Sequence, residues 1–171
     1  THAKICWQIE RIDALGITGP RDRVLLPLPL HHVYPVVVGL LVPLAAGVPI
    51  VLPYGLTGPQ VRRALTGAAV TSIVGVPRLY TALLAGLEQA LGAHGRLAAA
   101  ATRGVLAALA ALRRSTGLRL PHAVLAPLHR RLGGELRLLA SGGAALDPPL
   151  ALRLEALGFD VVTGYGLTET A

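Results

Sequence analysis

The sequence predicts a doubly wound α/β domain with a mainly parallel, five-stranded sheet, helices on both faces and a helical insertion before the fourth strand. Three observations support this prediction. Short apolar runs alternate with stretches whose leucines recur at helical spacing. The runs carry few charges, as expected for strands buried on both faces. Their alternation with helices is typical of right-handed βαβ units. At 171 residues, the chain is long enough for one domain with a substantial core.

The predicted elements follow one another in a regular order. A helix is expected at residues 3–15, and β-type runs lie at residues 24–28, 49–52, 70–74, 136–140 and 160–163. Apolar residues at helical spacing predict three more helices, marked by Tyr80, Leu83, Leu84, Leu87 and Leu91, by Leu125, Leu128 and Leu132, and by Leu150, Leu154 and Leu157. The last of these helices is expected to begin after the N-cap Asp147, with Pro148 in its first position, and to stop at Gly158.

Residues 24–61 contain no Asp, Glu, Lys or Arg, so hydropathy alone would indicate a membrane span. Prolines interrupt this stretch too often for one continuous helix, at Pro27, Pro29, Pro35, Pro43, Pro49 and Pro53. We therefore interpret it as a buried strand, a buried helix and a second buried strand.

The predicted insertion, residues 91–135, is rich in Ala, Leu and Arg. From Arg78 to Arg137 there are nine Arg and two Glu, so the whole net charge of +7 falls in this window. Seven of these arginines lie within 36 residues that hold no acidic residue: Arg96, Arg103, Arg113, Arg114, Arg119, Arg130 and Arg131. Two interpretations stay open, solvated helix faces or attraction to an anionic surface such as a membrane leaflet. Nucleic acid is disfavoured because no aromatic residues interleave with the arginines.

Cys6 is the only cysteine, so there is no disulfide framework and no metal-type Cys spacing. The first residues, from Thr1 to Lys4, lack the pattern of a signal peptide. Both observations favour a cytoplasmic protein, with the inner membrane face as the place of any peripheral docking.

Three unusual loops each follow a predicted strand. They are Pro29-Leu30-His31-His32, Ser141-Gly142-Gly143-Ala144-Ala145-Leu146 and Gly164-Tyr165-Gly166-Leu167-Thr168-Glu169-Thr170. In an open parallel sheet, ligands bind outside the carboxyl ends of the strands. We therefore expect the three loops to converge on one site.

Two of these loops suit a flat or phosphorylated ligand. Ser141-Gly142-Gly143 offers backbone N–H groups with no side chain in the way. Tyr165 has room on both sides because Gly164 and Gly166 flank it, which suits a ring that stacks on a ligand. Taken alone, a Ser-Gly-Gly after a strand is most often an ordinary turn.

The remaining polar groups suit charge chemistry. Thr168 and Glu169 put a hydroxyl beside a carboxylate, a workable pair for phosphate and Mg²⁺. His31 and His32 can hydrogen-bond a carboxylate near neutral pH. Each feature also has an ordinary structural explanation, an N-cap for the Thr-Glu pair and a satisfied polar group for the histidines. Their combination is what favours a site.

Together these segments resemble the adenylate-forming superfamily, which includes acyl-CoA synthetases, firefly luciferase and peptide-synthetase adenylation domains. The loop after the fifth run matches its YGxTE signature, and the loop after the fourth matches its SGGAPL-like loop. Leu28-Pro29-Leu30-His31-His32-Val33-Tyr34 resembles the PLxH segment in its long-chain form, and Gly75-Val76-Pro77-Arg78-Leu79-Tyr80 resembles the VPR segment. Because the basic insertion is also a long-chain feature, the chain looks like an internal fragment of the AMP-binding domain of a long-chain fatty-acid CoA ligase.

The resemblance implies a two-step reaction. A fatty acid attacks ATP to give an acyl-adenylate and pyrophosphate, and the thiol of CoA then displaces AMP. The resemblance also implies the residue roles. Tyr165, between Gly164 and Gly166, packs on the adenine. Gly142, Gly143 and Ala144 line the adenine and acyl side. Thr168 contacts the phosphate, Glu169 holds Mg²⁺ and His32 lies near the reacting carboxylate.

The sequence departs from the family pattern at three positions, since Pro35 replaces a frequent acidic residue, Ala145 replaces proline and Thr163 replaces Asn, Gln or Asp. It holds no phosphate loop ending in Pro-Lys-Gly, no later ribose-binding aspartate and no C-terminal domain with a catalytic lysine. We therefore expect residues 1–171 to be a single fragment, inactive alone, with βαβ units at 24–90, the insertion at 91–135 and adenine- and Mg²⁺-binding strand–loop units at 136–171.

Two alternatives remain open at this point. The first is a non-catalytic, flavodoxin-like module that binds a nucleotide at the same sheet edge. The second is an adenylate-forming enzyme whose substrate is a short-chain, aryl or amino acid.

Overall fold

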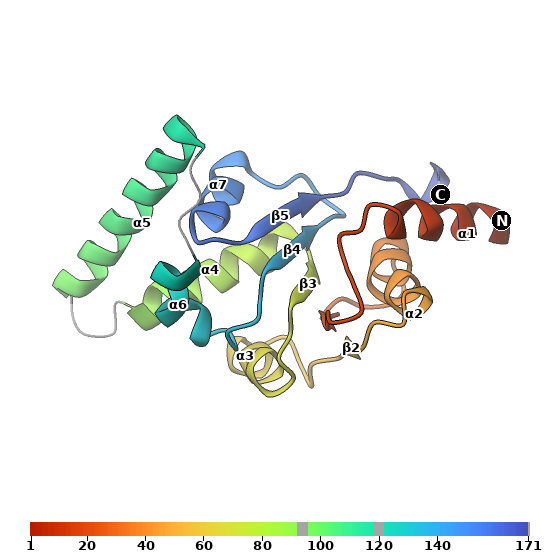
Figure 1. Cartoon of the computed structure of the whole chain (residues 1–171), viewed down its shortest axis with the longest axis horizontal. Helices are drawn as coiled ribbons and strands as arrows, with labels where there is room; N and C mark the ends of the chain where they lie inside the picture. The colour runs from red at the N-terminus through yellow and green to blue at the C-terminus, as the bar shows by residue number, and fades with distance from the viewer. Residues whose placement is uncertain (92–95, 118–121, 171) are drawn as a thin grey trace.

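The computed structural model describes residues 1–91, 96–117 and 122–170, and its centre is one five-stranded, all-parallel sheet in the order β2-β1-β3-β4-β5 (Figure 1). The strands are β1 (Val24–Leu25), β2 (Ile50–Val51), β3 (Ser72–Gly75), β4 (Leu138–Ser141) and β5 (Asp160–Thr163). Val24 pairs with Ile50 on one side and with Ser72 on the other, and Ser72 pairs in turn with Leu138. The predicted parallel sheet is confirmed.

Strand boundaries differ from the predicted ones except at β5. The first strand pairs only at residues 24 and 25, because Pro27 and Pro29 have no N–H to donate to a ladder. The third and fourth strands begin two residues later than predicted. Val70 and Leu136 are fully buried but lie just ahead of the paired segments. The apolar runs therefore predicted which residues are buried more accurately than which residues pair with a neighbouring strand.

Helices cover both faces of the sheet. One face packs against α3 (Gly58–Gly67), α4 (Pro77–Leu91), α6 (His122–Arg130) and α7 (Pro148–Ala156), with α5 (Arg96–Thr116) outside α4 and α7. The other face packs against the π-helical segment η1 (Pro35–Leu41) and its continuation α2 (Val42–Ala45), and α1 (His2–Asp13) lies on these two. A 3₁₀ turn, η2 (Thr168–Thr170), follows β5. This confirms the doubly wound architecture.

Successive side chains along a strand belong alternately to two hydrophobic clusters, one on each face of the sheet. Leu25, Ile73 and Leu139 belong to the large cluster on the α4 face. Their neighbours Val24 and Val74 belong to the smaller cluster on the η1 face. Since successive side chains of a strand point to opposite faces, a strand covered by helices on both sides must be apolar on both sides.

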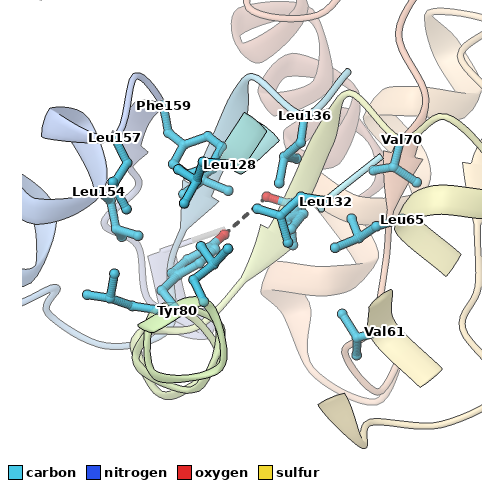
Figure 2. Packing of buried hydrophobic residues seen from close by; sticks show 14 of the residues in the cluster. Val61, Leu65, Val70, Tyr80, Leu128, Leu132, Leu136, Leu154, Leu157 and Phe159 are labelled. Carbon is cyan, nitrogen blue, oxygen red and sulfur yellow. Dashed lines mark hydrogen bonds between the residues drawn. The ribbon is translucent and has the colours of Figure 1, made fainter. Parts of the chain in front are cut away.

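Tyr80 of α4 is the largest side chain buried in the core, and it packs among Leu65, Leu136, Leu154 and Phe159 (Figure 2). Its hydroxyl donates to the backbone carbonyl of Ile73 at 3.1 Å. The same hydroxyl lies 2.5 Å from the carbonyl oxygen of Ala140 on β4. The buried phenol is therefore fully paired, as a polar atom in an apolar core requires.

The charge-free stretch 24–61 forms β1, the helical run η1–α2 and β2 in the predicted order, but β2 is only half-buried. Pro35 and Pro43 occupy the first turns of η1 and α2, where a missing N–H costs little. Within the described residues, no helix is long and apolar enough to cross a membrane.

The insertion before β4 forms the helices α5 and α6 in its described part, followed by a turn at residues 131–134. The helix α5 packs on α7, and Arg113 of α5 forms an ion pair with Glu155 of α7 at 3.1 Å. This arginine is therefore not a solvated charge, in contrast to one of the two interpretations of the basic segment. Arg119 lies outside the described residues.

Candidate functional site

The three loops singled out in the sequence meet in one cleft of about 870 Å³ outside the carboxyl ends of the strands. His31 and His32 line it from the loop after β1, Gly143 from the loop after β4, and Gly164–Glu169 from the segment after β5. Figure 1 shows the segment after β5 beside α1, which forms another wall. The expected convergence at one sheet edge is therefore confirmed.

The segment after β5 presents its side chains to solvent. Tyr165 is 94% exposed, and no other part of the chain lies within 4 Å of a Cβ placed at Gly164 or Gly166. The ring of Tyr165 therefore has open space around it for a planar ligand. Thr168 and Glu169 are also exposed, on η2, and line the same cleft.

His31 and His32 form a pair in the wall of the cleft. Both side chains are exposed, and their ring centroids lie 4.2 Å apart. They follow Pro29, also in the cleft wall, and precede η1, so the end of β1 and the start of a helix together hold their backbone. The two histidines and Glu169 line the same cleft.

The Ser-Gly-Gly loop contributes less to the cleft than the sequence indicated. Gly143 has a φ of +77°, which disfavours any side chain, and it lines the cleft. Gly142 is buried, and a Cβ on it would lie 2.5 Å from the ring of Tyr34. Ala144 is exposed but does not line the cleft. The missing side chain of Gly142 therefore makes room for Tyr34 within the protein.

Tyr34, to which the sequence reasoning gave no role, connects the loops. Its hydroxyl donates to the Ala140 carbonyl at 2.9 Å, and the Tyr80 hydroxyl lies 2.5 Å from the same oxygen, on the other face of the sheet. Burial raises the pKa of both tyrosines, so both hydroxyls stay protonated as donors. Ala140 directly precedes the Ser-Gly-Gly loop. The available signal was that Tyr34 and Tyr80 belong to the PLxH-like and VPR-like segments.

Behind Tyr34 lies a smaller hollow of about 170 Å³ with mainly apolar walls, including Val38 and Val74. Tyr34 and Val38 line both the hollow and the cleft. Ser72 and Ser141 face the hollow, and their buried hydroxyls have no hydrogen-bond partner among the described residues. Tyr34 therefore separates an open cleft from an inner, narrower space.

The helix α1 supplies side chains that the sequence reasoning also missed. Trp7, Gln8, Arg11 and Ile12 line the cleft. The guanidinium of Arg11 lies 5.6 Å from the centroid of the Trp7 ring, within the range of a cation–π contact. Their i, i+4 spacing in a predicted helix was the signal that they share a face. Arg11 brings a positive charge to the cleft.

The side chains that line the cleft favour a metal ion that is bound partly by the protein and partly by a ligand. Within the described residues, no three His, Cys, Asp or Glu side chains are grouped to bind an ion. Mg²⁺ usually keeps several waters and binds through one or two carboxylates plus substrate phosphates. The exposed carboxylate of Glu169, beside the Thr168 hydroxyl, fits that need.

The fold resembles those of several solved enzymes. Apo MatB from Rhodopseudomonas palustris superposes with a TM-score of 0.66 at 21% identity, over 99% of this chain and 26% of that one. A malonyl-CoA ligase bound to methylmalonyl-CoA and AMP gives 0.60 at 24% identity, over 97% and 28%. The N-terminal domain of FACL13 from Mycobacterium tuberculosis gives 0.55 at 21% identity, over 90% and 28%. The chain thus spans about a quarter of the length of these proteins.

No curated protein sequence matches the chain. The family described as "AMP-binding enzyme" matches it over residues 1–171, its entire length. The parallel sheet and the glycine-rich loops at its carboxyl edge agree with that match. The chain belongs to the AMP-binding enzyme family.

Proposed function

We propose that this chain forms part of an adenylate-forming ligase that activates a carboxylic acid with ATP and passes the acyl group to CoA. The observation that supports this most is the single cleft in which His32, Tyr165 and Glu169 meet from loops far apart in sequence. Acyl transfer through an adenylate needs a planar site for the base, polar groups for the phosphates and space for the acid. The cleft offers all three side by side.

The nucleotide is proposed to bind along the segment after β5. The exposed ring of Tyr165 stacks on the adenine, with Gly164 and Gly166 leaving room for it. The backbone of Gly143 approaches the base closely, since no side chain intervenes. Gly142 and Ala144, which the resemblance also places on the adenine and acyl side, flank Gly143 but do not line the cleft.

The phosphates are proposed to lie between η2 and the histidine pair. The Thr168 hydroxyl donates to a phosphate oxygen, and the Glu169 carboxylate holds Mg²⁺. The bound ion supplies positive charge to the phosphates. His32 hydrogen-bonds the acid's carboxylate and keeps it in line with the α-phosphorus, which is positioning rather than covalent catalysis.

In the proposed first step, a carboxylate oxygen forms a bond to the α-phosphorus of ATP while the bond to the β-phosphate oxygen breaks. Pyrophosphate leaves with that bonding pair, and the product is the mixed anhydride acyl-AMP. In the second step, the sulfur of CoA attacks the acyl carbon, its thiol proton passes to solvent or a base, and AMP leaves. Fixed dipoles around the crowded phosphorus lower the barrier of the first step.

A long-chain fatty acid is the substrate that we propose within this class. The lining of the cleft also includes apolar side chains, among them Leu28, Val37 and Val38. The His31-His32 form of the first loop and the long helical insertion favour the same substrate. Short-chain, aryl and amino acids are the alternatives, and comparing acids of increasing length in one exchange assay separates them.

The proposed division of the chain follows these roles. Residues 24–90 supply the βαβ units and the histidine pair, and residues 136–171 supply the strand–loop units for adenine and Mg²⁺. Residues 91–135 form an insertion outside the sheet. A non-catalytic nucleotide-binding module is the rival from another class, and it predicts nucleotide binding without pyrophosphate exchange.

The test is ATP–pyrophosphate exchange by the intact enzyme that contains this chain, with Glu169→Ala as the variant. Losing one preorganised electrostatic contact to the transition state typically costs about 100- to 1000-fold in rate, so exchange should fall by that factor. The matched control is Glu135→Ala, which removes an exposed carboxylate ahead of β4, at the opposite edge of the sheet. The control should keep its exchange rate within about twofold.

Both variants should unfold at the same urea concentration as the parent, because both carboxylates are exposed. Near-normal exchange in Glu169→Ala would refute the assignment of this residue. Absence of exchange in the parent with every acid tested would refute the ligase proposal and favour the binding module.

A further inference from the structure

A row of large apolar side chains stands exposed on the loop between β2 and α3, residues 52–57. Leu52 is 65% exposed, Tyr54 is 96% exposed and Leu56 is 64% exposed. Exposed apolar residues that occur singly are ordinary, but neighbours that form a patch mark an interaction surface. The loop lies on the β2 side of the sheet, away from the cleft at α1 and η2 (Figure 1).

Next to this loop runs a second, separate groove of about 750 Å³ between α3 and α4, closed by the end of α6. Its floor is apolar and includes Val61, Leu83 and Leu87. Leu56 lines it at the loop end, so the exposed row and the groove form one surface. We call loop 52–57 and this groove together the α3 surface.

The rim of the α3 surface is basic. Arg62 of α3 and Arg130 of α6 line the groove, and Arg63 stands exposed beside Arg62. Among the described residues, these three arginines form no ion pair, and no acidic side chain lines the groove. By contrast, Arg113 and Arg153 are bonded to Glu155 and Glu88. The rim charges are therefore available to an external anion.

We propose that the α3 surface docks the protein on an anionic phospholipid membrane. Leu52, Tyr54 and Leu56 enter the interface between headgroups and chains, where an aromatic ring with a polar hydroxyl is favoured. Arg62, Arg63 and Arg130 meet the lipid phosphates, and the groove holds the apolar part of one lipid. Lipid explains the surface better than an acidic helix, because the three apolar side chains project from a loop and do not line the groove wall together.

This inference moves the expected basic contact from the insertion mainly to α3, and of the seven insertion arginines it keeps Arg130. The sequence indicated the arginines of the insertion, yet Arg113 is bonded within the protein and Arg119 lies outside the described residues. Arg62 and Arg63 come from α3, ahead of the basic window. The inference is independent of the ligase chemistry, since none of these residues lines the cleft.

The test is co-sedimentation of the intact enzyme with two kinds of vesicle, phosphatidylcholine alone and phosphatidylcholine mixed with phosphatidylglycerol. We expect binding to the anionic vesicles only, and its loss in high salt. Each arginine near an anionic surface adds about fivefold in affinity, so Arg62→Gln and Arg63→Gln should each weaken binding by about that factor. Arg114→Gln, an equal loss of charge on the exposed face of α5, is the matched control and should change binding less than twofold.

The apolar part is tested with Tyr54→Ser and Leu56→Ser, which should weaken binding to anionic vesicles even at low salt. ATP–pyrophosphate exchange of each variant reports whether the protein is still folded. Equal binding to both vesicle types, or equal loss in Arg62→Gln and Arg114→Gln, would overturn the proposal. So would full binding by Tyr54→Ser, because the exposed row would then serve another purpose.

Discussion

The two edges of the parallel sheet use polar residues in opposite ways. At the edge where the strands begin, Asp22 is buried and receives hydrogen bonds from the Gly19 N–H at 2.7 Å and the Thr71 hydroxyl at 2.6 Å. Arg137 adds two more, at 3.2 and 2.6 Å, and also donates to the Ile17 carbonyl. One carboxylate thus ties together the segments that lead into β1, β3 and β4.

At the edge where the strands end, the polar side chains have few internal partners. His32, Tyr165 and Glu169 are exposed, and within the described part of the chain their side chains make no hydrogen bond. A group already bonded within the protein has little capacity left for a ligand. The first edge therefore serves stability, whereas the second leaves its polar side chains free for the binding that we propose.

Replacing Asp22 should give the largest loss of stability. Asp22→Ala leaves Arg137, Thr71 and the Gly19 N–H without their shared acceptor, and we expect about 2–4 kcal/mol of lost unfolding free energy. Urea unfolding of the intact enzyme measures it. Asp147→Ala is the matched control, since Asp147 is exposed and makes no capping hydrogen bond, and it should cost under about 0.5 kcal/mol. Equal losses in both variants would remove the distinction between the two edges.

Two glycines, Gly142 and Gly166, allow a second comparison at the edge where the strands end. Gly142→Ala puts a methyl group 2.5 Å from the ring of Tyr34, and such overpacking costs about 1–3 kcal/mol of stability. Gly166→Ala meets open space and should change the unfolding free energy by less than about 0.5 kcal/mol. Its effect should be on the KM for ATP, because the methyl group narrows the space beside Tyr165. The glycine assignments are wrong if the two variants behave alike in both measurements.

Lowering the pH should destabilise the protein at the edge of the sheet where the strands begin, because Asp22 becomes protonated there. Burial raises the pKa of Asp22, but the hydrogen bonds from Arg137, Thr71 and Gly19 and the charge of Arg137 outweigh it and lower the pKa below its ordinary value. Because the folded pKa is the lower one, this stabilisation is present above the ordinary value of about 3.9 and is lost as the pH falls through the folded value. The stability difference between the protein and Asp22→Asn should therefore shrink below about pH 4, whereas a constant difference would contradict the network.

The pattern of the sequence was sufficient for the sheet and for the place of the site. Apolar runs with few charges predicted five strands, because a strand covered on both faces must be largely apolar on both sides. Asp160–Thr163 was predicted with its observed bounds, and Asp147 with Pro148 marked the start of α7. Because all strands run in parallel, the loops with His32, Gly143 and Tyr165 had to reach the same edge.

The sequence did not reveal the contacts between residues far apart in the chain. Nothing in local spacing indicated that Asp22, Thr71 and Arg137 would meet, or that Tyr34 would fill the space beside Gly142. Trp7 and Arg11 became cleft residues only because α1 packs on η1. Periodicity records which face of an element is apolar, whereas the partner of a side chain depends on how elements pack. For that reason the sequence determined the sheet and the edge at which its loops meet, and the tertiary structure alone decided which residues hold that edge in place.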